Sequence, residues 1–387
     1  MRPPSPFSIR IPDPVLDDIR ERIRRYPWDD LPDAGGWDCG TDLATLRALA
    51  EYWLESYDWR AEETKLNRLP QFRAEAAGLV LHYIYVKGTG PKPLPIILSH
   101  GWPGSFFEFD HLVEQLADPG RFGGDPADAF DVVVPSLPGY GFSDRPARPI
   151  GPRSTARHFN ALMTEVLGYP RYLAQGGDWG AVISSVLGSE HAASCCALHL
   201  NMLGLRGPDM APVSAAEQEW ARRSEARFGQ EGAYLRLQAT RPQSLGFAMM
   251  DSPVGVAGWI IEKFAAWSDL PRAPDGSPEL WPRYGRDQLL TNIMLYLVTK
   301  SFASATWMYR GFFAEPPTAL PAGTRIEVPV GFAAFPDPID RPPPRSLVEK
   351  SYNITRWTEM PRGGHFAALE APDLFLDDLR AFARTIR

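Results

Sequence analysis

Short apolar runs alternate with helical stretches along two separated parts of this chain, and this alternation restricts the fold more than any other feature. The apolar runs have the length of buried strands, and the stretches between them repeat apolar residues at helical spacing. Strands are expected at 79–88, 94–100, 130–136, the start of 171–180, 197–202, 326–335 and 353–360. Helices are expected near 154–167, from Ala181 onward and at 372–385. This order predicts an α/β fold with a mainly parallel sheet flanked by helices.

The first part of the chain is expected to be helical instead. Apolar residues over 15–23 recur at helical spacing after Asp13-Pro14, a pair that often starts a helix. Residues 41–57 form a second amphipathic pattern, for which Thr41 is the expected N-cap.

A second helix-rich region lies over 206–318, where no buried-strand pattern is present. The simplest division is an N-terminal segment over 1–77, one α/β core over 78–205 and 319–387, and a helical insert between the two core parts. Ligand sites in such cores lie beyond the carboxyl ends of the strands.

Composition narrows the classes of partner. The chain has 387 residues, of which 44% are hydrophobic and 22% charged, as in ordinary globular proteins that bury a large core. Lys and Arg total 40 against 47 Asp and Glu, which gives a net charge of −7. This mildly acidic balance argues against nucleic acid or an anionic membrane as the main partner.

Cysteine and histidine usage gives no sign of a disulfide framework or a metal site. The three cysteines are Cys39, Cys195 and Cys196, and the seven histidines are scattered. The amino-terminal residues lack the apolar stretch of a signal peptide, and no run of 18 apolar residues occurs. We therefore expect a protein of a reducing compartment, the cytoplasm, with no metal and no membrane span.

A glycine-rich turn, Gly176-Gly177-Asp178-Trp179-Gly180, follows an apolar run and precedes a helix. Small residues at these spacings are typical of a nucleophile elbow, which pushes its central side chain outward. That central residue is Asp178, and a carboxylate that attacks carbon forms an alkyl ester. The substrate should then carry an electrophilic sp³ carbon with a leaving group. A plain turn in which Asp178 caps the helix is the alternative.

A second turn, His100-Gly101-Trp102-Pro103-Gly104, follows the apolar run 94–100. The backbone N–H groups of Trp102 and Trp179 are candidate donors to a developing oxyanion. His100 is expected to bond locally rather than to act in catalysis.

His365 is the candidate base, because it follows the last expected strand and precedes the last helix. The order nucleophile, acid, histidine is that of the α/β-hydrolase triad. The acid should follow the strand 326–335, where Asp337 and Asp340 are both candidates. Asp337 is preferred because it is nearer the strand end, and it would orient the imidazole.

With these residues placed, the chain resembles the epoxide hydrolases of the α/β-hydrolase superfamily, in the microsomal and juvenile-hormone branch with its soluble bacterial relatives. The resemblance covers nearly the whole chain, and the region 1–77 looks like the N-terminal meander of that family. Its most specific segments are HGWPGSFFEF (100–109), PSLPGYGFSD (135–144), QGGDWG (175–180) and RGGHFAALE (362–370), and DSPVGVAGWIIEKF (251–264) is similar to the family's cap.

The resemblance implies a cofactor-independent enzyme that opens an epoxide to a vicinal diol. It also implies that Tyr234 and Tyr309, in the insert, act as acids toward the epoxide oxygen; from the residues alone, both would be taken as core aromatics. Two departures are present. The chain begins at the meander, without the anchor of microsomal relatives, which implies a soluble protein. The acid usually lies at F-P-x-Asp/Glu, whereas Asp337 comes one place earlier.

Two other functions fit parts of the pattern. A haloalkane dehalogenase shares the Asp and the His, and would use indole N–H groups such as those of Trp102 and Trp179 to bind halide. A hydrolase fold kept as a small-molecule binding protein is the other. A serine esterase is disfavoured because the elbow carries Asp178.

The insert is rich in aromatic and Met side chains, which favours an apolar or aromatic epoxide as the substrate. These residues are Phe247, Met249, Met250, Trp259, Phe264 and Trp267. A homodimer formed through the meander is compatible with the sequence, as are both a biosynthetic and a detoxifying role. The sequence specifies neither the regiochemistry nor the enantioselectivity.

Overall fold

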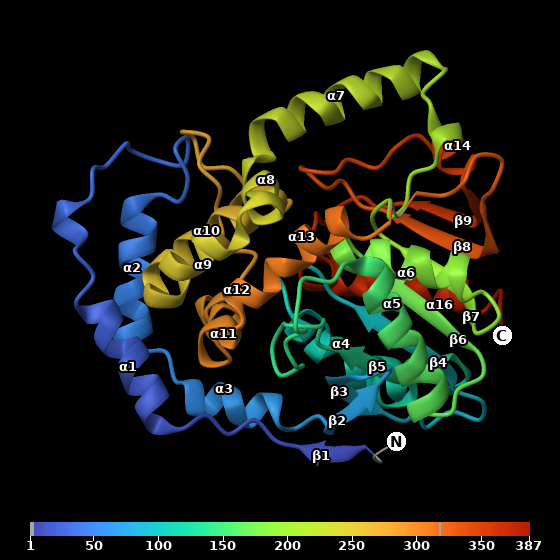
Figure 1. The fold of residues 1–387 in the computed structure, drawn as a ribbon, viewed down its shortest axis with the longest axis horizontal. Coiled ribbons are helices and arrows are strands. Elements are labelled where there is room, and N and C mark those ends of the chain that lie inside the picture. Colours follow the sequence, from blue (N-terminus) through green and yellow to red (C-terminus); the bar gives the residue numbers. More distant parts are fainter. Residues whose placement is uncertain (1–3, 317–318) are drawn as a thin grey trace.

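The computed structural model describes residues 4–316 and 319–387, which are built around one sheet (Figure 1). The strand order is β1-β2-β3-β5-β4-β6-β7-β8-β9. From β5 to β9 all neighbours are parallel, whereas β1, β2, β3 and β5 pair antiparallel. The strands are β1 (Ser5–Phe7), β2 (Gln71–Ala76), β3 (Leu79–Val86), β4 (Leu94–Ser99), β5 (Phe130–Pro135), β6 (Tyr172–Gly176), β7 (Cys195–Leu200), β8 (Ile326–Ala334) and β9 (Tyr352–Glu359).

Two helix pairs flank this sheet. One pair is α5 (Pro152–Ala161) and α6 (Asp178–Glu190), which pack on each other, and α6 also packs on β4, β6 and β7. The other pair is α4 (Asp110–Ala117), which packs on β5, and α16 (Pro372–Ala383), which packs on α4 and β8. The apolar strands β4, β5 and β6 are buried between these layers, which explains why they show no polar alternation.

The region predicted as an insert is mostly helical where it is described, with an irregular stretch over 268–285, and its end, residues 317–318, lies outside the described residues. Its helices gather over one end of the sheet (Figure 1). They are α7 (Ala215–Glu231), α8 (Ala233–Thr240), α9 (Pro242–Asp251), α10 (Pro253–Trp267), α11 (Arg286–Val298), α12 (Phe302–Ala305) and α13 (Trp307–Ala314). We call this group the cap.

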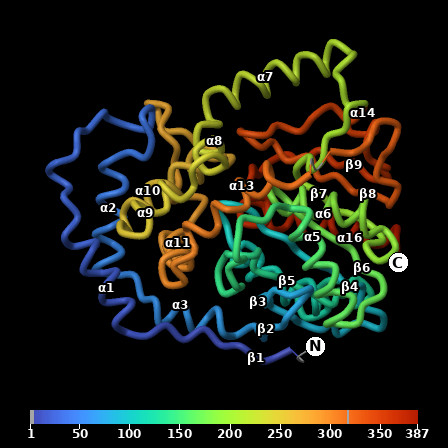
Figure 2. The backbone as a smooth tube through the Cα atoms, in the orientation of Figure 1, coloured from blue at the N-terminus to red at the C-terminus, as the bar shows by residue number. Residues whose placement is uncertain are grey.

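The N-terminal segment adds a strand, β1, to the sheet edge and then runs along the outer side of the cap, at the left of the view (Figure 2). Its helices are α1 (Asp13–Arg24), α2 (Leu43–Glu55) and α3 (Trp59–Leu66). The guanidinium of Arg22 donates to the carbonyl oxygens of Met250, at 3.2 Å, and Asp251, at 3.0 Å. The hydroxyls of Tyr57 and Thr291 are 3.1 Å apart. The start of the chain therefore braces the cap.

Several local expectations were wrong. Asp42, rather than Thr41, caps α2, because its carboxylate accepts from the N–H of Thr45 at 2.7 Å. Thr41 instead donates to the carbonyl of Gly258 in the cap at 2.6 Å. The strand predicted over 197–202 is β7, which begins and ends two residues earlier. The short strand β1 was not expected in a region predicted to be helical.

The remaining helices are short and connect these elements. They are α14 (Arg345–Val348) and α15 (Ala367–Glu370), with 3₁₀ turns at Trp28–Asp30, Phe106–Phe109, Pro119–Phe122, Pro126–Asp128 and Pro208–Met210 and a π-helical turn at Leu162–Val166. In the described chain, no single helix has the length and apolar content to cross a membrane; by those two criteria alone, the pair α9 and α10, bent by 118°, would qualify.

Candidate active site

Asp178 lies at the sharp turn between β6 and α6, with a φ of 48°. A non-glycine residue at positive φ is strained and is held only by the surrounding structure. The turn needs small residues, because a Cβ on Gly176 would overlap the carbonyl of Gly180 and one on Gly180 would overlap the carbonyl of Ser99. The helix expected from Ala181 begins instead at Asp178 itself. The carboxylate is thus presented at the carboxyl end of the sheet.

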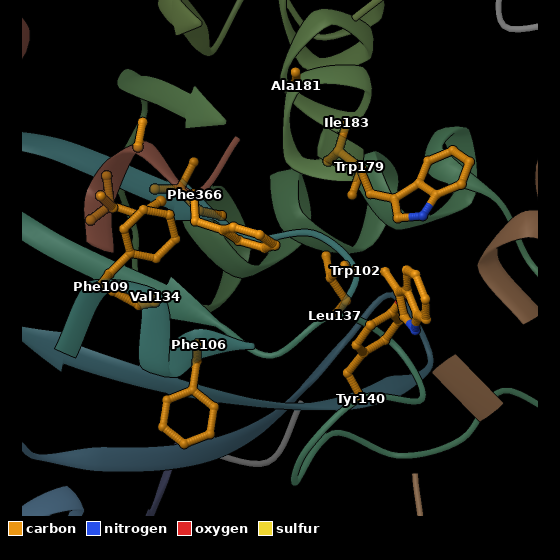
Figure 3. Packing of buried hydrophobic residues seen from close by; sticks show 14 of the residues in the cluster. Trp102, Phe106, Phe109, Val134, Leu137, Tyr140, Trp179, Ala181, Ile183 and Phe366 are labelled. Carbon is orange, nitrogen blue, oxygen red and sulfur yellow. The ribbon is translucent and has the colours of Figure 1, made fainter. Parts of the chain in front are cut away.

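The loop after β4 supplies an amide to this carboxylate. Since β4 and β6 are parallel neighbours, their carboxyl ends meet, and the N–H of Trp102 donates to Oδ1 of Asp178 at 2.8 Å. Among the described residues, the N–H of Trp179 makes no such bond to Asp178. Figure 3 shows Trp179 at the start of α6, above Trp102.

His100 makes only local bonds. Its Nδ1 is 2.9 Å from the carbonyl of Gly101, and its Nε2 accepts from the N–H of Leu137 at 3.1 Å. Burial lowers the pKa of His100 to about 4, so the ring is neutral and serves to join two loops.

His365 lies between two carboxylates. Its Nε2 is 3.3 Å from Oδ2 of Asp178, and its Nδ1 is 2.8 Å from Oδ2 of Asp337. Burial alone would lower the pKa of His365, but the charges and hydrogen bonds of Asp337 and Asp178 outweigh it and raise this pKa well above its ordinary value. The three residues predicted as nucleophile, acid and base are thus brought together.

The hydrogen bonds around His365 distinguish the two candidate acids, Asp337 and Asp340. Oδ1 of Asp337 accepts from the N–H groups of Ile339, at 2.8 Å, and Asp340, at 3.2 Å, which leaves Oδ2 for His365. The side chain of Asp340 makes no hydrogen bond to His365 among the described residues. Burial, followed by the charge of Asp337, raises the pKa of Asp340 to about 6.

Tyr234 on α8 and Tyr309 on α13 face the same carboxylate from the cap. Their ring centroids are 5.9 Å apart; Tyr234 stacks on Trp102 at 5.3 Å, and Tyr309 meets Trp179 edge-on at 4.8 Å. Burial raises the pKa of both phenols well above the ordinary value, so both are protonated donors.

A cavity of about 480 Å³ connects these groups to the surface; we call it the cap cavity. Asp178, His365, Tyr234 and Tyr309 line it, and most of its other lining residues are apolar. These include Val182, Met202, Leu203, Leu235, Trp267, Phe312 and Ile339. Phe228 and Phe313, which are 40% and 61% exposed, lie at its mouth. Such a cavity suits a small, largely apolar molecule.

Comparisons with known proteins identify the family of this chain. Residues 4–109 match the family model described as epoxide hydrolase N terminus, and residues 95–304 match the alpha/beta hydrolase fold. The chain is 38% identical to a putative epoxide hydrolase of Stigmatella aurantiaca, over 99% of this chain and 85% of that one. It is 34% identical to epoxide hydrolase 1 of Oryctolagus cuniculus, over 97% and 88% respectively. The chain belongs to the epoxide hydrolase family.

Solved structures place this epoxide hydrolase in the same fold. The epoxide hydrolase of Aspergillus niger superposes with a TM-score of 0.85 at 33% identity, over 100% of this chain and 97% of that one. The juvenile hormone epoxide hydrolase of Bombyx mori gives 0.83 at 30% identity, over 99% and 94%. The predicted α/β-hydrolase fold and the family resemblance are confirmed, and the protein is an enzyme that acts on small-molecule epoxides.

Some residues that hold the site of this epoxide hydrolase were not predicted. The carboxylate of Glu370 accepts from the N–H groups of Gly364 and Phe366, on either side of His365, each at 2.9 Å. It also accepts from the N–H of Asp269 in the cap at 2.7 Å. Glu370 lies in the segment RGGHFAALE, but its burial was not visible in the sequence.

The cap also holds the loop that carries Trp102. Asn292 donates to the carbonyl of Pro103 at 2.8 Å, and Tyr296 donates to the carbonyl of Gly104 at 2.6 Å. These bonds fix α11 against the loop and set the position of the Trp102 amide. Across residues 4–316 and 319–387, no cluster of three or more His, Cys, Asp or Glu side chains could hold a metal ion.

Proposed function

We propose that this enzyme hydrolyses an epoxide in two steps, through an ester on Asp178. One observation carries the proposal. Oδ1 of Asp178 is bonded to the Trp102 amide while Oδ2 lies 3.3 Å from Nε2 of His365, and Asp178, His365, Tyr234 and Tyr309 all line the cap cavity. Nucleophile, base and acids thus converge on one apolar cavity.

In the first step, Oδ2 of Asp178 attacks one ring carbon, because Oδ1 is already held by the Trp102 amide. The bond from this carbon to the epoxide oxygen breaks, and the oxygen takes a proton from Tyr234 or Tyr309. The products are a hydroxyalkyl ester of Asp178 and a tyrosinate. Positioned acids of this kind contribute roughly 10²–10⁴-fold to a rate.

Ester formation also changes His365. In the free enzyme, two carboxylates keep its pKa high, so the imidazole carries a proton. When Asp178 becomes an ester, one of these charges disappears and the pKa of His365 falls. The proton that His365 then releases restores the tyrosine, and a neutral base remains.

In the second step, His365 takes a proton from water, and the water oxygen bonds to Cγ of Asp178. The N–H of Trp102, joined by that of Trp179, stabilises the charge on Oδ1. The ester C–O bond then breaks, and the leaving alkoxide takes the proton of the Asp178 carboxyl group. A vicinal diol departs, with Asp178 ionised and His365 protonated as at the start.

The lining of the cap cavity supports an apolar or aromatic epoxide as the substrate. The three cysteines are free thiols, which supports a reducing compartment, the cytoplasm. A dimer formed through the N-terminal segment stays a prediction.

A panel of aryl and alkyl epoxides, supplied without metal or cofactor, tests the function. Diol should form with the wild type and with Asp340→Asn, and not with Asp178→Ala. Equal diol formation by wild type and Asp178→Ala would remove Asp178 from the mechanism.

A further inference from the structure

A second, small cavity lies behind Asp178, on the core side; we call it the rear cavity. It offers about 20 Å³ to the centre of a water molecule, which is enough for one water. The rear cavity shares Asp178 and His365 with the cap cavity, but the described residues that line it include none from the cap. Its other polar lining side chains are Ser99, Glu108 and Asn201.

Glu108 is a half-buried residue whose carboxyl group the two-step scheme does not use. It belongs to the 3₁₀ turn after the Trp102 loop, and its carboxyl group fills the space in which a side chain on Gly104 would lie. Burial raises the pKa of Glu108 to about 8, against the opposing charge of His365 and the N–H groups of Gly101 and Ser105. Besides these two N–H groups, a carboxyl group can accept further hydrogen bonds, so a water molecule in the rear cavity can also bond to it.

Two further polar atoms belong to residues that line the rear cavity. Within the described chain, Oγ of Ser99 has no hydrogen-bond partner, and Nε2 of His365 pairs only with Oδ2 of Asp178, at 3.3 Å, the oxygen that the ester would take up. Both residues line the rear cavity together with Glu108. One water molecule placed there would have polar partners on several sides, as buried waters require.

The position of this cavity fits the second step. An ester on Asp178 projects its alkyl group into the cap cavity, where it displaces water from the apolar walls. Asp178 and His365 also line the rear cavity, so a water molecule there would adjoin both the ester and the base.

We propose that Glu108 and Ser99 hold the hydrolytic water in the rear cavity, so that it attacks the Asp178 ester from the core side. The inference rests on the two-step scheme proposed above. One O–H bond of this water breaks, its proton passes to Nε2 of His365, and its oxygen bonds to Cγ. Its other hydrogen is directed to the carboxyl group of Glu108, which stays in its original protonation state.

The test separates the two steps in single turnovers with an epoxide that the wild type hydrolyses. Ester formation is followed by the fluorescence of Trp102 and Trp179, which adjoin Asp178, and by the mass of the acid-quenched protein. The variants are Glu108→Leu, Glu108→Gln and Ser99→Ala. Glu217→Gln is the matched control, because this buried carboxylate bonds Ser346 and Lys350 at the far end of α7.

Glu108→Leu should slow ester hydrolysis by about 10² or more, as removal of a catalytic hydrogen bond does, and leave ester formation within about threefold. The ester should accumulate. Glu108→Gln keeps a hydrogen-bonding group, so its rate of ester hydrolysis should lie between those of Glu108→Leu and the wild type. Ser99→Ala should slow ester hydrolysis by about tenfold. Both remain informative if the Leu variant does not fold.

Two results would overturn the proposal. Hydrolysis by the Glu108 variants at the rate of Glu217→Gln would exclude a role in holding water. Equal slowing of both steps would show that Glu108 only supports the Trp102 loop. A His365→Gln variant distinguishes failure of the two-step scheme from failure of the water site. If no ester accumulates in His365→Gln, the two-step scheme is wrong. If the ester accumulates there but Glu108→Leu hydrolyses it at the normal rate, only the water site is wrong.

Discussion

Nε2 of His365 lies 3.3 Å from Oδ2 of Asp178, so the negative charge of the nucleophile acts directly on the base. Any reaction that neutralises Asp178 must change the proton affinity of His365. The protonation of the base is therefore coupled to progress along the reaction, and the two steps should respond differently to mutation and to pH.

Substitution of the base should trap the ester. His365→Gln removes the acceptor for the water proton, so hydrolysis should fall by about 10³-fold or more while ester formation persists. Intact-protein mass spectrometry should show one added epoxide, located on the peptide that carries Asp178. Release of diol at the wild-type rate would rule out His365 as the base.

The pH dependence should belong to the second step. His365 must be neutral to accept a proton, so hydrolysis of the ester should rise with pH through the lowered pKa of His365 and then level off. Ester formation needs only an ionised Asp178 and should be flat over the same range. Single-turnover rates from about pH 5 to about pH 9 check this. A rise in both steps with the same midpoint would contradict the coupling.

The paired phenols should act on the first step. Tyr234→Phe and Tyr309→Phe should each slow ester formation by roughly 10–10²-fold, and the double variant by about 10³-fold or more. A dehalogenase would not need these hydroxyls, so turnover of haloalkanes by the double variant would favour that reaction. Tyr284→Phe, which alters a buried phenol bonded to Ser268, is the matched control.

Substitution of Asp337 and substitution of Asp340 should have very different effects on the rate of ester hydrolysis. Asp337→Asn removes the charge that orients Nδ1 of His365 and should slow hydrolysis by roughly 10²–10⁴-fold. Asp340→Asn should change the rate by less than about tenfold, because Asp340 makes no bond to the imidazole. The reverse order of effects would assign the triad acid to Asp340.

A stability prediction concerns Asp378 on α16. Burial would raise its pKa, but hydrogen bonds from His199, Thr358 and Arg356 outweigh this and lower the pKa to about 2. Because the folded pKa lies below the unfolded value of about 4, this contribution is present above about pH 4 and is lost as the pH falls toward the folded value. Asp378→Ala should lower the free energy of unfolding by about 3–5 kcal/mol at pH 7.

Urea denaturation at neutral and acid pH checks this expectation. The difference between wild type and Asp378→Ala should shrink in acid. Asp373 lies on α16 as well and forms an exposed ion pair with Arg362. Asp373→Ala should lower the free energy of unfolding by less than about 1 kcal/mol. A deficit for Asp378→Ala that stays constant down to pH 2 would show that the loss does not come from the charge.

The parts of the site that were predictable from the sequence depend on local signals. The small residues around Asp178 are required by the close approach of β4 and α6, and they are adjacent in the chain. The order of Asp178, the acid and His365 follows from the order of the parallel strands. The start of α6 was misplaced at Ala181, because the glycines of the turn do not resemble a helix.

The remaining site residues depend on contacts between distant segments. Asn292 reaches Pro103 across 189 positions, and Glu370 reaches Asp269 across 101. Nothing local distinguishes Glu108 or Glu370 from an exposed glutamate. The choice between Asp337 and Asp340 likewise needed the path of the chain after β8.

The cap is hydrogen-bonded on two sides, by the N-terminal segment along its outer side and by the loop that carries Trp102. A domain anchored in this way cannot swing open as a lid without breaking many bonds at once. Phe228 and Phe313, which are exposed and line the cap cavity, then border a passage that epoxide and diol would share. For bulky substrates, release of the diol through that passage, rather than the chemistry at Asp178, would then limit the turnover rate.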